Sequence, residues 1–179
     1  MASKRRERRD RHELGVASFL VDYLAQQGVT LTNCRNGDAA GGEPDVVCEF
    51  GSEQRGIEVV DCWFSDGDAK LTWDLVADLE ERGIRQTIVS TSGVNGPQDH
   101  PSGDPLIAEC QRQLDDHGIR SYGIPTWLLL NASQAPLHSE SEGPAIVSWL
   151  KKPAPWRYLD AYVCLAQNMT WGRHFFKVS

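Results

Sequence analysis

Residues 43–60 read EPDVVCEFGSEQRGIEVV, and this stretch decides how the first half of the chain folds. Two runs rich in β-branched residues, 45–50 and 56–63, are separated by a polar turn of five residues. Pro44 precedes the first run and Gly51 follows it. Two such runs joined by a short turn predict an antiparallel hairpin.

Two acidic residues distinguish this hairpin from an ordinary one. Asp45 opens the first strand, and Glu58 lies inside the second, between Ile57 and Val59. A charged side chain in an apolar strand is costly unless it is paired or bound to a metal. Carboxylates on neighbouring strands repel each other, and a divalent cation that prefers oxygen ligands, such as Mg²⁺ or Mn²⁺, removes that repulsion. The hairpin therefore predicts a metal site that could activate water next to a phosphoryl oxygen.

Structural roles could also explain the acidic residues of the hairpin. Aspartate is common where a strand follows a turn, which would account for Asp45. An ion pair with Arg35 or Arg55 would account for Glu58. Glu43 is either a further acidic ligand or an ordinary loop residue. The sequence leaves these alternatives open.

The rest of the chain alternates between helical and strand patterns. The run TWLLLN at 126–131 is nearly all apolar, which predicts a central strand buried on both faces. Consecutive strands followed by helix–strand alternation indicate an α/β fold with a mixed central sheet flanked by helices. A length of 179 residues indicates one domain, spanning 12–179 after a basic N-terminal arm at 1–11. The remaining predicted elements are helices at 12–27, 69–82, 104–117 and 145–151 and strands at 29–34, 84–90, 158–166 and 174–178.

The N-terminal arm is positively charged, whereas the chain as a whole is negatively charged. The net charge is −7, which argues against a protein that coats nucleic acid over its whole surface. Residues 4–11 nevertheless hold six cations against two anions. We expect Arg5, Arg6, Arg8 and Arg9 to contact the phosphates of DNA or RNA, although a solvated, frayed terminus would have the same composition.

Cysteine usage and the absence of long apolar runs indicate the compartment. The five cysteines are scattered singly, with no C-x-x-C pair, and no secretory signal or membrane-spanning run is visible. The sequence therefore predicts reduced thiols rather than disulfides, a cytoplasmic protein and no membrane partner.

The hairpin resembles that of the PD-(D/E)xK nuclease superfamily, whose members share the restriction-endonuclease-like fold. Pro44 and Asp45 match the PD of its motif, and Glu58 matches the (D/E). Glu13, on the preceding helix, is similar to an auxiliary carboxylate of the family. The resemblance covers roughly residues 10–130 in element order, an αβββαβ core. It implies hydrolysis of phosphodiester bonds in nucleic acid with Mg²⁺ or Mn²⁺ held by Asp45, Glu58 and Glu13, and it is compatible with a homodimer.

One position departs from the family pattern. The superfamily places a lysine two residues after the acidic residue, on the same strand face, and Val60 stands there in this chain. Valine can neither orient water nor stabilise a charged phosphate. Lys70, at the start of the next predicted helix, could replace that lysine as a catalytic residue, or could be a solvated helix residue. Val60 and the net charge of −7 favour a second hypothesis, a catalytically inactive nuclease-fold module that binds nucleic acid or protein.

Overall fold

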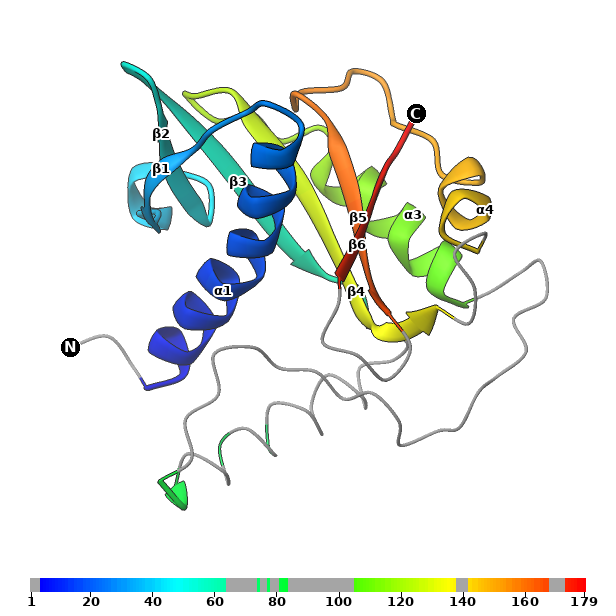
Figure 1. Ribbon diagram of the computed structural model, residues 1–179, viewed down its shortest axis with the longest axis horizontal. Coiled ribbons are helices and arrows are strands. Elements are labelled where there is room, and N and C mark those ends of the chain that lie inside the picture. The colour runs from blue at the N-terminus through cyan, green and yellow to red at the C-terminus, as the bar shows by residue number, and fades with distance from the viewer. Residues whose placement is uncertain are drawn as a thin grey trace.

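The computed structural model describes residues 4–63, 74, 77, 81–83, 105–137, 142–167 and 173–179. Lys70, most of the predicted helix at 69–82 and the predicted strand at 84–90 lie outside these residues. Within the described residues the chain forms a six-stranded mixed sheet with α-helices on both faces (Figure 1), which confirms the predicted α/β class. No helix in this part of the chain is long and apolar enough to cross a membrane.

Six strands form the sheet in their order along the chain. They are β1 (Thr32–Asn36), β2 (Val46–Phe50), β3 (Glu53–Asp61), β4 (Thr126–Leu137), β5 (Ala161–Gln167) and β6 (Arg173–Lys177). Pairing is parallel between β3, β4 and β5 and antiparallel elsewhere. The predicted hairpin is confirmed, because β2 and β3 pair with Val46 opposite Ile57. The predicted central strand is confirmed too, since Leu128, Leu129 and Leu130 of β4 are 0% exposed.

The described residues contain three α-helices, which are α1 (Lys4–Gln26), α3 (Pro105–His117) and α4 (Glu142–Ser148). α1 packs one face of the sheet with its apolar stripe, which includes Leu20. α3 covers the opposite face with Leu106 and Leu114, and α4 contributes to the same core (Figure 1). Successive side chains of β3 point to opposite faces of the sheet. Val59 therefore packs in the core on the side of α1, and Val60 packs in the core on the side of α3.

α1 begins at Lys4, so the prediction that the first helix begins at His12 is wrong. That prediction followed apolar spacing, which does not detect turns made of charged residues. An ion pair four residues apart, between Arg9 Nε and Glu13 Oε1 at 2.5 Å, supports these turns. Residues 4–11 of the segment predicted as a basic arm, 1–11, are therefore the first turns of a continuous helix.

A buried polar contact holds the charged end of α1 against the sheet. His12 is 2% exposed, and its Nε2 lies 2.9 Å from Asp61 Oδ1 at the end of β3. Asn131 of β4 donates from Nδ2 to the same oxygen at 2.6 Å. The network fixes the helix turn that carries Arg9 and Glu13.

We expect His12→Ala to lower the free energy of unfolding by about 1–3 kcal/mol, because the carboxylate of Asp61 would lose a buried partner. Urea denaturation followed by circular dichroism measures this change. His12→Gln places an amide nitrogen near the position of Nε2 and should lose less stability than the alanine variant. Equal stability of the two variants would contradict a role for this hydrogen bond.

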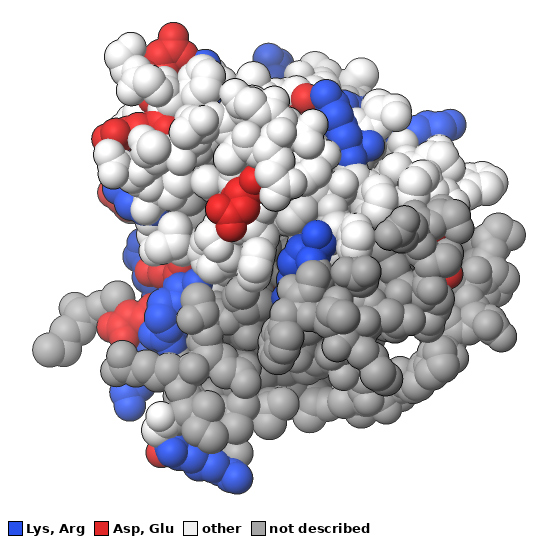
Figure 2. Space-filling model, in the orientation of Figure 1, with Lys and Arg blue, Asp and Glu red and all other residues white. Residues whose placement is uncertain are grey.

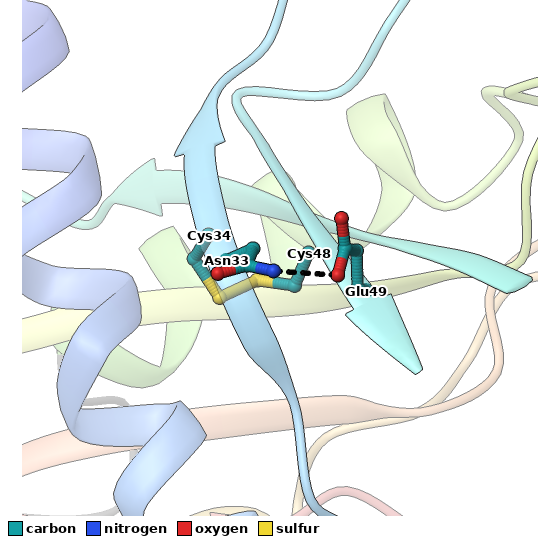
Figure 3. The surroundings of a disulfide bond; sticks show 4 residues. All are labelled: Asn33, Cys34, Cys48 and Glu49. Atoms are coloured by element: carbon teal, nitrogen blue, oxygen red, sulfur yellow. Dashed lines mark hydrogen bonds between the residues drawn. A yellow bond between two sulfur atoms is a disulfide. The ribbon is translucent and has the colours of Figure 1, made fainter. Parts of the chain in front are cut away.

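Cys34 of β1 and Cys48 of β2 form a disulfide (Figure 3), so the prediction of reduced thiols is wrong for this pair. The two cysteines are 14 residues apart in the sequence, and antiparallel strand pairing brings their Cα atoms to 4.0 Å. Asn33 and Glu49, next to them, add a hydrogen bond of 2.6 Å across the same strands. The other three cysteines remain buried thiols, as predicted; they are Cys62, Cys110 and Cys164.

Candidate active site

β3 extends past β2, and this leaves one edge of β3 open. β2 begins at Val46, and among the described residues no strand pairs with residues 58–61 on that side. Asp45 directly precedes β2 and covers the start of this edge, since its Oδ2 accepts a hydrogen bond from the Val59 N–H at 2.9 Å. Continuing the hairpin register places Asp45 opposite Glu58. The two predicted acidic residues therefore lie together at an open strand edge.

Gly37 and Gly56 lack side chains, which allows Pro44 to pack closely against them. This packing positions Asp45, the next residue. A Cβ atom on Gly37 would lie 1.8 Å from the Pro44 carbonyl oxygen, and one on Gly56 would lie 2.4 Å from the Pro44 ring. The Gly37 N–H also donates to the Asp45 carbonyl at 2.8 Å. Any larger residue at either glycine would push this segment away from β3.

A cavity of about 1050 Å³ opens beside these acids. Its walls come from the N-terminal half of α1, the segment before β2, the end of β3, the end of α3 with Arg120 after it, and Asp74 and Ala77. Acidic and basic side chains lie next to one another along the lower left edge of Figure 2, on the side where Figure 1 shows the N-terminal end of α1. The predicted ligands and the predicted phosphate-binding arginines all line this one cavity; they are Glu13, Asp45, Glu58, Arg5, Arg6, Arg8 and Arg9.

Glu58 is held as a carboxylate by groups from the end of α3 and the loop after it. Its side chain is 6% exposed, and Arg120 donates from Nη1 to Oε1 at 3.2 Å. His117 Nδ1 lies 3.4 Å from the same oxygen, and Tyr122 adds a hydrogen bond. Burial alone would raise the pKa of Glu58, but its contacts with His117 and Tyr122 and the positive charge of Arg120 outweigh burial and hold the pKa below its usual value.

The ion-pair partners predicted for Glu58 are wrong. Arg35 instead pairs with Glu43 at 2.8 Å, and Arg55 pairs with Glu53 at 2.6 Å. The arginine that contacts Glu58 stands 62 residues further along the chain, where local spacing cannot reveal it. Glu43, considered as a further ligand, is engaged by Arg35, which holds the pKa of that carboxyl at about 2.

The environment of Asp45 disfavours the charged form of its side chain, whereas that of Glu58 favours it. Burial raises the pKa of Asp45, and the negative charges of Glu58 and Glu13 raise it further, to about 8. The Val59 N–H and Arg9 act in the other direction without offsetting this rise. The pair therefore carries one proton near neutral pH, and the positive charge of Arg120 beside Glu58 favours that proton on Asp45. Such a pair is typical of sites that bind a cation or transfer protons.

α1 contributes a third acid and a cation. Burial raises the pKa of Glu13, and contact with Arg9 only partly offsets this rise. Arg9 Nη2 also lies 3.7 Å from Asp45 Oδ1. One guanidinium therefore links the acid on α1 to the acid that precedes β2.

The donor set has the chemistry of a site for a hard cation. Glu13, Asp45 and Glu58 offer the carboxylate oxygens that Mg²⁺ and Mn²⁺ prefer. The raised pKa of Asp45 reflects negative charge that a divalent cation would neutralise. In the part of the chain that the structure describes, no group of three or more His, Cys, Asp or Glu side chains is arranged to hold a metal ion. Arg9 and Arg120 supply positive charge to these carboxylates instead.

Sequence reasoning missed the contribution of α3 and the loop after it. The spacing of four residues between Arg9 and Glu13 could have suggested their contact, but no local pattern relates His117 or Arg120 to Glu58. Parallel pairing of β4 with β3 decides this contact, because it brings the segment that leads into β4 alongside the acids.

No protein-family model, curated protein or solved structure matches this chain. The chemistry of the cavity is therefore the basis for the function proposed below.

Proposed function

We propose that this protein is a metal-dependent nuclease that hydrolyses phosphodiester bonds in nucleic acid, built on a restriction-endonuclease-like αβββαβ core. One observation carries the proposal: the carboxylates of Glu13, Asp45 and Glu58 share a single cavity with arginines of α1. Carboxylates hold the catalytic cation in such sites, and arginines bind phosphates. The order α1, β1, β2, β3, α3, β4 among the described elements supports that core.

Asp45, Glu58 and Glu13 would hold the Mg²⁺ or Mn²⁺. When bound, such a cation activates water and stabilises negative charge on the phosphoryl oxygens. The chain's own groups prepare the site for it. The Val59 N–H orients Asp45, and contacts that include Arg120 keep Glu58 ionised.

Arg120 would supply the positive charge that the family's lysine would provide at Val60, and His117 lies beside the same carboxylate. The Val60 side chain packs in the core on the side of α3. Arg120 is half exposed and lines the cavity, so its guanidinium can contact both Glu58 and a phosphate. Lys70, predicted in this role, lies outside the described residues.

Cleavage assays test the proposed function. The purified protein is incubated with Mg²⁺ or Mn²⁺ and single- or double-stranded DNA or RNA, with EDTA as the control. Cleavage that needs the metal is the expected result. Intact substrate in every combination would overturn the assignment as a nuclease.

Arg5, Arg6 and Arg8 are expected to supply much of the affinity for nucleic acid. Replacing all three by glutamine should weaken binding about 10–100-fold at low salt, since each arginine that contacts a phosphate releases counterions. The slope of log affinity against log salt should fall by about 2–3. Fluorescence anisotropy with a labelled oligonucleotide in EDTA measures both quantities.

A matched variant removes the same charge away from the cavity. Replacing Lys151, Lys152 and Arg157 by glutamine should change the affinity less than about threefold, because none of them lines the cavity. Equal losses in the two triple variants would show that net charge, rather than this cavity, determines binding.

The surroundings of Glu58 favour a second candidate function. Arg120 and His117 already contact this carboxylate, and Val60 leaves β3 without the family's lysine. These features suit a nuclease-fold module that binds nucleic acid without cutting it. Oligonucleotide binding with no cleavage under either metal would identify this function.

A further inference from the structure

Arg9 bridges two of the acids that would hold the metal. Its Nε donates to Glu13 Oε1 at 2.5 Å, and its Nη2 lies 3.7 Å from Asp45 Oδ1. The guanidinium therefore contacts two carboxylates from different parts of the fold. One belongs to α1 and the other to the segment before β2.

A divalent cation and this guanidinium compete for the same oxygens. Mg²⁺ binds carboxylate oxygens at about 2.0–2.1 Å and demands a near-octahedral shell. A guanidinium in contact with the same carboxylates occupies part of that shell and repels the cation. Metal binding at Glu13 and Asp45 thus requires Arg9 to move.

A phosphate can draw Arg9 away from the acids. The Arg9 side chain is 65% exposed, and it lines the cavity together with Arg5, Arg6 and Arg8. Arg5 and Arg9 are four residues apart and lie on one face of α1. Phosphate oxygens offer the forked guanidinium of arginine the same two-point contact that carboxylates do.

We propose, on the basis of the proposed function, that Arg9 is a positioning residue that couples the two ligands of this site. Without nucleic acid it holds Glu13 and Asp45 and hinders metal binding. With nucleic acid its guanidinium transfers to a phosphate, and the carboxylates become available to the cation. Nucleic acid and metal therefore bind cooperatively, and each raises the affinity for the other by the same factor.

Mn²⁺ titration tests this coupling without any cleavage. Free Mn²⁺ is followed by electron paramagnetic resonance, first without nucleic acid. Arg9→Gln should bind Mn²⁺ about 10-fold more tightly than the wild type, within the range of about 5–150-fold that is usual for couplings between sites. Arg112→Gln is the matched control, because Arg112 also bridges two carboxylates on a helix but does not line the cavity. It should bind Mn²⁺ as the wild type does.

A second titration adds an oligonucleotide to the wild type and to Arg9→Gln. A phosphorothioate oligonucleotide that resists cleavage should raise the Mn²⁺ affinity of the wild type at least about fivefold, and should raise that of Arg9→Gln much less. An oligonucleotide without effect on the wild type, or an Arg9→Gln variant that binds Mn²⁺ no more tightly than the wild type, would overturn the role of Arg9.

The two proposals fail in different ways. Metal-dependent cleavage by the wild type together with unchanged Mn²⁺ affinity in Arg9→Gln would leave the nuclease standing and remove the coupling. No Mn²⁺ binding by any variant, with or without oligonucleotide, would remove both the metal site and the coupling.

Discussion

Replacing Glu58 by glutamine should lower metal-dependent cleavage of nucleic acid by about 1000-fold or more. Glutamine keeps the shape of the side chain and can still accept the hydrogen bond from Arg120, but it removes the charge that a cation needs. A catalytic metal contributes several kcal/mol to the stabilisation of a transition state, and about 1.4 kcal/mol corresponds to a tenfold change in rate. Initial rates in Mg²⁺ and in Mn²⁺, measured on the substrate that the wild type cleaves best, give this ratio.

Glu53→Gln is the matched control for this loss. Glu53 lies on the same strand, is 63% exposed and pairs with Arg55 outside the cavity. Its replacement should leave the rate within about twofold, because surface substitutions of this kind seldom perturb a distant site. Unaltered near-ultraviolet circular dichroism verifies that both variants are folded. A Glu58→Gln variant that cleaves as fast as Glu53→Gln would eliminate this glutamate from the mechanism.

Asp45→Asn should make the metal-free protein more stable at pH 8 by about 2–4 kcal/mol. Burial and the charges of Glu58 and Glu13 raise the pKa of Asp45 in the folded protein to about 8, from a usual value of 3.8. Between these two values the unfolded chain binds fewer protons than the folded one, so the wild type loses stability as the pH rises. At about 1.4 kcal/mol per pH unit, the full loss has an upper bound of ~6 kcal/mol. The amide of asparagine avoids this loss, and its oxygen can still accept the hydrogen bond from the Val59 N–H.

The pH dependence distinguishes this explanation from a general gain in packing. In urea denaturation with EDTA, the advantage of Asp45→Asn should be small near pH 4 and should grow until pH 8. Asp116→Asn, which removes a carboxylate that is 55% exposed, should stay within about 0.5 kcal/mol of the wild type throughout. An advantage of Asp45→Asn that is equal at both ends of the range would contradict the raised pKa.

The local patterns of the sequence were sufficient to predict the hairpin and to single out its two acidic residues. Strand alternation and the turn at 51–55 predicted the pairing of β2 with β3. The apolar run at 126–131 predicted the central strand. Both predictions depend on residues close together in the sequence, where periodicity and turn chemistry operate. The burial of Glu58 also followed, because β-branched residues flank it, whereas the arginines predicted as its ion-pair partners were wrong.

The partners of these residues depend on the tertiary structure. Arg120 reaches Glu58 because β4 runs parallel to β3, and Cys34 meets Cys48 because β1 and β2 pair. Spacing within one element cannot encode contacts that strand pairing creates between distant segments.

The sequence by itself determined that Asp45 and Glu58 come together in the hairpin, Glu58 on β3 and Asp45 directly before β2, and that they need positive charge. Only the tertiary structure decided which groups supply that charge, namely Arg120 beside Glu58 and Arg9 beside Asp45. The physical reason is that a buried carboxylate requires a cation within a few ångströms, whereas nothing in the local chain specifies which distant element provides it.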